Sequence, residues 1–225
     1  MDSKGPGVGK DVFDRTAAAL GILLTSPVLL ICAAAVWIDD GAPVFFRQVR
    51  VGKNGRLFRL VKFRSMRSGQ RGTSITVSND SRITRAGGFL RSYKLDELPQ
   101  LWNVLRGDMS FVGPRPEVPE YVELASPEWR IVLSVKPGIT DLATLLYRNE
   151  EKILFLQPDP QRYYREVVLP AKMSLSIAFI RASNFWLECK LIAYTIYYSV
   201  FPHRLDSGRL GRIFAPALAD HSVDN

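Results

Sequence analysis

The sequence predicts an α+β fold, a small and mostly helical domain with one β-hairpin, anchored to a membrane near its N-terminus. Three observations support this. A long stretch has no charged residue, and two segments typical of β-strands flank an Asn-Gly turn. Apolar residues elsewhere recur at helical spacing. We divide the 225 residues into a flexible tail (1–9), a membrane segment (10–40), a single domain (41–202) and a C-terminal tail (203–225).

The membrane segment contains 23 uncharged residues from Thr16 to Ile38, enough for a membrane helix. A cleaved signal peptide is the competing interpretation, but the stretch ends in Trp-Ile-Asp-Asp and lacks a small-residue cleavage site. Ser26 and Pro27 divide it into two halves, each about half a hydrocarbon core long. Pro27 lacks an N–H, and a Thr25 or Ser26 hydroxyl can bond the carbonyl left free. We therefore predict a re-entrant helix-break-helix, with a kinked, spanning helix as the alternative.

The residues after the membrane segment predict a hairpin and several helices. Strands are expected over 44–51 and 57–66, because the Asn-Gly between them favours a tight turn. One helix is expected to begin after Thr84 as its cap, and a second, with Pro99 in its first turn, to end at Gly107. Two more are expected over 161–182 and 185–201, the second rich in aromatic residues. These suit amphipathic helices at a membrane interface.

The charge of the chain is concentrated in one stretch. Residues 41–95 contain thirteen Lys and Arg and a single acid, Asp80, within a chain of net charge +8. Such a stretch indicates an anionic partner, which could be nucleic acid, a lipid surface or a phosphorylated substrate. Its position just after a membrane segment favours lipid headgroups. A solvated basic face is the alternative without function.

Asp96 and Glu97 follow this basic stretch directly. Read locally, two acids at a helix N-terminus are caps that complement the helix dipole. A helix N-terminus can also hold phosphate, however, and carboxylates beside a phosphate site indicate a divalent cation, ordinarily Mg²⁺. No other catalytic pattern competes, because the only histidines are His203 and His221 and the two cysteines, Cys32 and Cys189, suggest neither a disulfide framework nor a metal site.

Four stretches, spread in order along the chain, carry a family pattern: Pro43–Gly52, Lys62–Met66, Leu95–Pro116 and Lys136–Thr140. They resemble the bacterial sugar transferase family, the monotopic polyprenyl-phosphate phosphoglycosyl transferases, in its minimal catalytic unit. The similarity covers roughly residues 10–200 and is most specific through Pro116. Asp141 stands where the familiar pattern has glycine, which weakens inference about substrate contacts from that loop.

The resemblance implies a two-step mechanism. Asp96 would attack the β-phosphate of a UDP-sugar, release UMP and hold the phosphosugar covalently, before polyprenyl (undecaprenyl) phosphate takes it over. Glu97 would bind Mg²⁺, with Asp96 sharing the metal. Arg91 and Arg115 would clamp phosphate oxygens. Lys62 and Arg64, which share one strand face, would add to the pocket unless they are simply exposed charges.

The resemblance also implies a cellular setting. The domain would face the cytoplasm from the bacterial inner (cytoplasmic) membrane, in contact with the cytoplasmic leaflet, and would catalyse the first membrane step of glycan assembly. We expect no nucleic-acid partner, and a homodimer stays open. The sugar cannot be read from the sequence. A membrane-anchored nucleic-acid binder or a scaffold for glycan enzymes are the rival functions, but neither gives a reason for Asp96 and Glu97.

Overall fold

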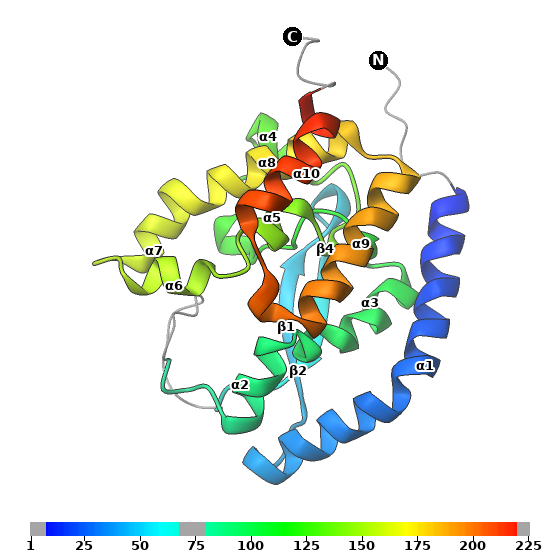
Figure 1. Cartoon of the computed structure of the whole chain (residues 1–225), viewed down its shortest axis with the longest axis vertical. Helices are drawn as coiled ribbons and strands as arrows, with labels where there is room; N and C mark the ends of the chain where they lie inside the picture. The colour runs from blue at the N-terminus through cyan, green and yellow to red at the C-terminus, as the bar shows by residue number, and fades with distance from the viewer. Residues whose placement is uncertain (1–7, 68–79, 220–225) are drawn as a thin grey trace.

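A computed structural model describes residues 8–67 and 80–219 and confirms the α+β class (Figure 1). Helices surround two small sheets. The α-helices are α1 (Val8–Asp40), α2 (Arg85–Ser92), α3 (Leu101–Arg106), α4 (Pro127–Val132), α5 (Leu142–Leu146), α6 (Glu150–Phe155), α7 (Pro160–Tyr163), α8 (Leu169–Ala182), α9 (Phe185–Val200) and α10 (Ser207–Ala219). The strands are β1 (Phe45–Val51), β2 (Leu57–Phe63), β3 (Ser110–Val112) and β4 (Gly138–Thr140). Single turns are η1 (Lys53–Gly55), η2 (Leu95–Gln100), η3 (Pro119–Tyr121) and η5 (Pro202–Arg204), and η4 (Tyr164–Val168) is a π-helical turn that joins α7 to α8.

The membrane segment is one helix of 33 residues, α1, which Figure 1 shows curving along its length. Pro27 cannot donate to the carbonyl of Leu23, and the Ser26 hydroxyl donates to that carbonyl instead, at 2.8 Å. The Thr25 hydroxyl donates to Gly21 in the same way, at 2.7 Å. The predicted compensation by hydroxyls is confirmed. Because it keeps the carbonyl satisfied, the predicted break is a bend within a continuous helix.

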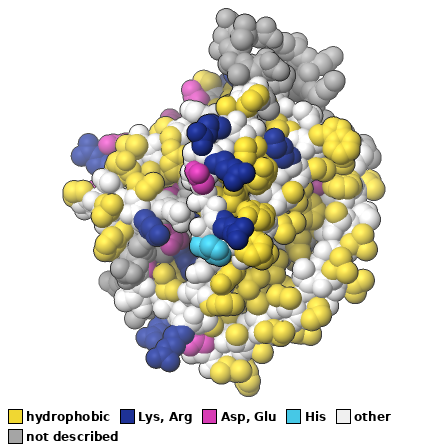
Figure 2. Space-filling view, in the orientation of Figure 1, with side chains coloured by type: hydrophobic (Ala, Val, Ile, Leu, Met, Phe, Trp, Pro, Cys, Tyr) yellow, Lys and Arg dark blue, Asp and Glu magenta, His cyan; other side chains and the backbone are white. Residues whose placement is uncertain are grey.

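The apolar side chains of α1 are mostly exposed. In the described part of the chain, the stretch Gly9–Asp40 is the one helix long and apolar enough to cross a membrane, and only 11% of its most apolar window is buried. Leu24, Leu30 and Ile38 are each more than two-thirds exposed. Figure 2 shows hydrophobic side chains gathered along the edge formed by α1. A core helix of a soluble protein would bury these residues, so the surface suits a lipid environment.

Both halves of α1 also pack on the rest of the domain. Ala18, in the first half, is fully buried in a cluster with Leu60 of β2. Val36, in the second half, packs with Phe63 of β2 and Leu90 of α2. The helix is therefore part of the domain core along its length and not only a tether.

The predicted hairpin is confirmed. Strands β1 and β2 pair antiparallel, from Phe45 opposite Phe63 to Val51 opposite Leu57. Asn54 in the connecting turn has φ 57°, the left-handed conformation that Asn adopts more readily than most residues. Beyond Phe63 the chain leaves the sheet, and Met66 makes only an isolated bridge to Ile83.

A second, parallel pair of strands fixes the proline-containing loop. Strands β3 and β4 lie so close that a Cβ on Gly113 would stand 2.3 Å from the carbonyl oxygen of Lys136. Glycine is thus required there for backbone contact. The loop that follows, with Arg115 between two prolines, starts from a rigid point.

The C-terminal prediction is wrong. Residues 203–225 were expected to form a tail, but Ser207–Ala219 form the helix α10, whose Leu210 and Phe214 are fully buried. Phe214 packs against Phe179 of α8, with 6.4 Å between ring centroids. Glycines and a proline within α10 hide its helical pattern, because they lower helix propensity while the buried residues, Leu210 and Phe214, lie only one turn apart. The expected tail 1–9 lies largely outside the described residues.

Candidate active site

One cavity of about 760 Å³ collects the site residues predicted from the sequence. Its wall is built by the hairpin, α2, η2, the proline-containing loop, the α5–α6 segment, η4 and α8. A volume of this size suits a ligand as large as a nucleotide sugar. The predicted residues that line it are Lys62, Arg64, Arg91, Asp96, Glu97 and Arg115.

The lining of this cavity is strongly basic. Among the described residues it has ten Lys and Arg side chains against five Asp and Glu. Seven of the ten come from the basic stretch 41–95. That stretch therefore contributes to a concave site and does not form only a solvated face, which favours a compact polyanion as its partner.

Asp96 and Glu97 lie in the 3₁₀ turn η2, which precedes α3, and not in the first turn of an α-helix as predicted. The turn begins after Lys94, whose φ of 57° reverses the chain direction out of α2. Pro99 lies within η2 without an N–H to donate, which suits a short turn that leads into a helix. Both acids are buried, with 4% and 7% exposure.

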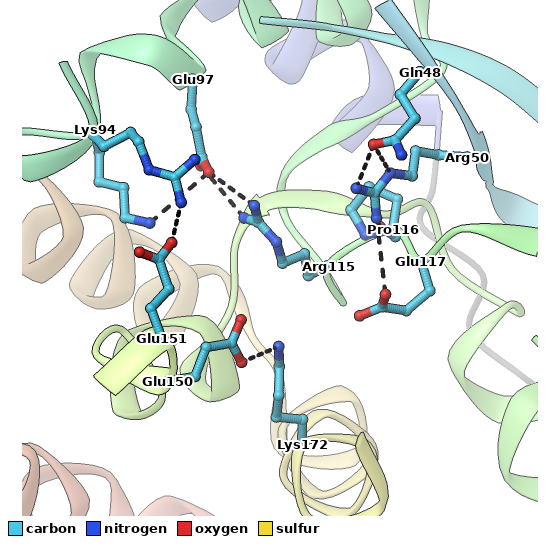
Figure 3. Close-up of polar contacts among 11 residues, drawn as sticks. Gln48, Arg50, Lys94, Glu97, Arg115, Pro116, Glu117, Glu150, Glu151 and Lys172 are labelled. Atoms are coloured by element: carbon cyan, nitrogen blue, oxygen red, sulfur yellow. Dashed lines mark hydrogen bonds and ion pairs between the residues drawn. The ribbon is translucent and has the colours of Figure 1, made fainter. Parts of the chain in front are cut away.

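Glu97 is held by charge. Its carboxylate accepts two hydrogen bonds from the Arg115 guanidinium, at 2.9 and 3.5 Å, and lies 4.0 Å from the ammonium of Lys94 (Figure 3). Burial by itself would raise the pKa of Glu97, but the charges of Arg115 and Lys94 outweigh it and hold the pKa well below its usual range. The same pairing raises the pKa of Arg115. Glu97 is thus ionised at every ordinary pH.

Asp96 has the opposite environment. Its Oδ1 is buried and has no hydrogen-bond partner among the described residues. Burial and then the negative charge of Glu97 raise the pKa of Asp96, against the charges of Lys94 and Lys62. Turn η2 has no side-chain cap at its N-terminus, so capping does not account for Asp96. A buried, unpartnered carboxylate oxygen in a basic cavity is placed to meet a ligand.

The three other predicted residues have different surroundings. Burial lowers the pKa of Lys62 to about 8, although Asp96 and Glu97 favour its charged form. Arg64 donates from Nη2 to the carbonyls of Asp40 and Gly41, at 2.6 and 2.8 Å, and so ties β2 to the end of α1. Its role toward phosphate stays a prediction. Arg91 is ion-paired with Glu151 of α6.

The sequence analysis missed a second cluster of polar residues in the wall of the cavity. The Tyr164 hydroxyl donates to Glu117 at 2.7 Å, and Arg50 donates to the carbonyl of Pro116 at 2.9 Å. Lys172 of α8 donates to Glu150 of α6 at 2.8 Å, as Figure 3 shows. Glu117 could have been found, since it follows the Pro-Arg-Pro run directly. The residues from α6, η4 and α8 carry no local pattern that links them to the site.

The departure at Asp141 has a structural explanation. Its carboxylate accepts from the backbone N–H of Thr144 at 2.6 Å and from the Ser176 hydroxyl at 2.7 Å. Asp141 is therefore the N-cap of α5 and a link from that helix to α8. Where the familiar pattern has a flexible glycine, this chain has a residue that fixes the start of α5.

The chain is similar to a known protein family and to several known proteins. The model of the bacterial sugar transferase family matches residues 6–202. The chain is 37% identical to an undecaprenyl-phosphate glucose phosphotransferase of Komagataeibacter xylinus, over 85% of this chain and 36% of that protein. It is 35% identical to the uncharacterized sugar transferase EpsL of Bacillus subtilis, over 83% of this chain and 85% of that protein.

A third relative differs in its sugar. The chain is 42% identical to a UDP-N-acetylgalactosamine-undecaprenyl-phosphate N-acetylgalactosaminephosphotransferase of Aeromonas hydrophila, over 60% of this chain and 33% of that protein. The chain thus spans about a third of the length of two of these relatives and most of the Bacillus protein. With its family pattern present over nearly the whole length, the chain belongs to the bacterial sugar transferase family.

Proposed function

We propose that this protein transfers a sugar 1-phosphate from a UDP-sugar to polyprenyl (undecaprenyl) phosphate. The observation that carries the proposal is the buried, unpartnered carboxylate oxygen of Asp96, next to the Glu97–Arg115 pair in a basic cavity. The names of the relatives support the substrate classes, because they describe phosphotransfer of glucose or N-acetylgalactosamine to undecaprenyl phosphate.

Asp96 is the nucleophile in this proposal. A carboxylate oxygen of Asp96 bonds to the β-phosphorus of the UDP-sugar, and the bond from that phosphorus to the bridging oxygen breaks. UMP leaves with the electron pair, and the sugar phosphate stays on Asp96 as an acyl phosphate. An oxygen of the lipid phosphate then bonds to the same phosphorus. The Asp96–phosphorus bond breaks, which restores the carboxylate and gives a polyprenyl diphosphate sugar.

The cations of the cavity orient the diphosphate. Arg115 offers a planar guanidinium whose position is fixed by Glu97 and by the prolines on either side. Arg91 and Lys62 stand on other parts of the wall and can neutralise further phosphate oxygens. Arg115 bound to Glu97 thus holds the reacting phosphate near Asp96, which is an effect of position and charge.

Mg²⁺ fits this donor set. No group of three acidic or other metal-binding side chains occurs in the described part of the chain, but Mg²⁺ commonly uses one or two carboxylates together with substrate phosphates. Glu97 and Asp96 would hold it. When bound, it would neutralise the diphosphate and favour the ionised form of Asp96.

The cellular setting belongs to the same proposal. The exposed apolar side of α1 would lie in the cytoplasmic leaflet of the bacterial inner membrane, with the cavity open to the cytoplasm, where nucleotide sugars are made. The lipid acceptor would then reach the cavity from the same membrane. Whether the protein forms a homodimer stays open.

The test is UMP release against a panel of UDP-sugars, with and without polyprenyl phosphate. We expect sustained UMP release that requires the lipid for at least one sugar, and loss of that release in Asp96→Asn. Glu166→Gln, which removes an exposed acid on η4, is the matched control and should keep full turnover. A scaffold or nucleic-acid binder would release no UMP with any sugar, and that outcome would overturn the proposal.

A further inference from the structure

Three side-chain polar atoms within residues 8–67 and 80–219 are buried without a hydrogen-bond partner: Arg64 Nε, Asp96 Oδ1 and Thr144 Oγ1. All three residues line the same cavity. Proteins rarely leave buried polar atoms unpaired, and each such atom calls for an explanation. Their concentration in one cavity indicates that a polar ligand completes the wall.

Of these three groups, the Thr144 hydroxyl is the one that the proposed mechanism does not use. Asp96 is assigned to the reacting phosphorus, and Arg64 is already tied through its Nη2 to the end of α1. The Thr144 hydroxyl has neither a role in the mechanism nor a hydrogen-bond partner among the described residues. It stands on α5, in the segment where this chain departs from the familiar family pattern.

The position of Thr144 is fixed from two sides. Its backbone N–H donates to Asp141, which is 2% exposed and also accepts from Ser176 of α8. A threonine in a helix has two common rotamers, so a fixed backbone limits the hydroxyl to two positions. Thr144 is therefore a preorganised hydrogen-bonding group and not an adaptable one.

The residues that follow Thr144 indicate the chemical class of the ligand. Tyr147, Arg148, Asn149 and Glu150 follow it on the cavity wall. Arg148 donates to the carbonyl of Ser92, four residues before Asp96, at 3.0 Å, so this wall lies near Asp96 and Glu97. The Arg148 guanidinium is bonded to Ser92, and the rest of this wall offers a hydroxyl, a phenol, an amide and a carboxylate, which match the hydroxyl groups of a polyol better than they match phosphate.

We propose that the Thr144 hydroxyl hydrogen-bonds to the sugar of the donor. The side of the cavity formed by Thr144 and the residues after it would then determine which sugar is accepted. The proposal rests on the proposed function. The sugar is attached to the phosphorus that Asp96 attacks, whereas the nucleoside departs with UMP. The sugar is thus the group other than phosphate that stays beside Asp96 through both steps. Relatives that transfer different sugars should then differ in this part of the cavity and not at Asp96 and Glu97.

Thr144→Val separates substrate contact from stability. The change keeps the shape and removes a hydroxyl without a protein partner, so the melting temperature should stay the same or rise. The value of kcat/KM for the UDP-sugar should fall about tenfold, and Thr144→Ser should restore most of it. Thr195→Val is the matched control, because the Thr195 hydroxyl bonds to Thr140 at 2.7 Å outside this cavity. It should lower the melting temperature and leave kcat/KM unchanged.

Inhibition by UMP identifies the contacted group. If Thr144 contacts the sugar, Thr144→Val weakens the UDP-sugar and leaves the inhibition constant of UMP unchanged. The loss should also disappear for one deoxy-sugar donor that lacks the contacted hydroxyl. Equal weakening of UMP and UDP-sugar would place Thr144 at the nucleotide and overturn the inference, as would an unchanged kcat/KM. Wild-type protein that turns over no UDP-sugar would instead overturn the proposed function, and this inference with it.

Discussion

The Arg115 guanidinium lies 2.9 Å from the Glu97 carboxylate, while the neighbouring Asp96 leaves a buried oxygen without a partner among the described residues. Two adjacent acids thus have opposite environments, one paired with cations and one with an oxygen that no described residue hydrogen-bonds. Environments that push the pKa values of two acids apart are a common basis for dividing roles between them. The first two predictions follow from this division.

Asp96→Asn should abolish the first half-reaction. Wild-type protein with UDP-sugar and no lipid acceptor should release about one UMP per protein and gain the mass of one phosphosugar. The variant should lose both signals, at least about a thousandfold in rate, because an amide is a poor nucleophile. Intact-protein mass and a peptide map test this. A normal burst from a folded Asp96→Asn protein would show that another residue carries the sugar phosphate.

Glu97→Gln should weaken Mg²⁺ dependence as well as rate. The amide keeps the shape of the side chain but removes the charge that Arg115 and a metal would share. A Mg²⁺ titration of the rate should need several-fold more metal for half-maximal activity. An unchanged titration would assign the metal to other residues.

Arg115→Lys should lower kcat/KM by about tenfold, or ~1.4 kcal/mol, although the charge is kept. Lysine cannot supply the paired donors that reach Glu97 and a phosphate together. Arg106→Lys is the matched control, since Arg106 is largely exposed and does not line the cavity. Equal activity of the two variants would return Arg115 to a purely structural role.

Lys62 should make substrate capture sensitive to alkaline pH. Its pKa of about 8 means that Lys62 is cationic below pH 8 and neutral above it. A neutral amine attracts phosphate less, so kcat/KM should fall by up to about tenfold per pH unit above that point. Lys62→Arg stays charged and should remove this limb of the profile. Lys152→Arg, outside the cavity, should keep the wild-type profile.

Asp141→Ala should destabilise the fold. It removes the cap of α5 and the acceptor of the Ser176 hydroxyl, which together cost about 1–3 kcal/mol of unfolding free energy. Urea unfolding measures this loss. Ser134→Ala, an exposed hydroxyl at the end of α4, should change it little. If Asp141→Ala kept full stability but lost turnover, Asp141 would act on the substrate and not on the helix.

Local patterns predicted the elements that local interactions stabilise. The Asn54-Gly55 turn, the Thr84 cap of α2 and the left-handed Gly107 after α3 each depend on a few neighbouring residues, and all three are present. Asp96, Glu97 and Arg115 were likewise found within one specific stretch of sequence, Leu95–Pro116. All three residues line the same cavity, and their roles in it stay predictions.

Features that depend on distant packing were missed. Helix α10 exists because Leu210 and Phe214 fill a gap against α5, α8 and α9, and no local signal describes that gap. Lys172 lies far along the chain from the dyad and reaches the cavity only because α8 crosses beside it. Thr144 could be singled out only after its hydroxyl was seen to be buried and unpartnered.

The last prediction concerns how α1 sits in the membrane. Asp11, near its start, lies 2.9 Å from Lys136 before β4, and Asp40, at its end, lies 3.2 Å from Arg64, which follows β2. Both ends of the helix therefore contact the same domain. A straight helix that spans the bilayer would place its ends about 45 Å apart on opposite sides, where one domain cannot bind both.

We therefore expect single cysteines at Ser3 and Ser134, in a background with Cys32→Ser and Cys189→Ser, to be labelled from the cytoplasmic side only. Labelling of the two positions from opposite sides would contradict the re-entrant arrangement. Replacement of Ser26 and Pro27 by leucines should straighten α1 and move Ser3 to the far side in a measurable fraction of molecules, since it removes the cause of the bend. If Ser3 stayed cytoplasmic in that variant, the contacts at the two ends of α1 would be what holds the turn. Adding Asp11→Asn, which breaks the Lys136 pair, should then shift the labelling.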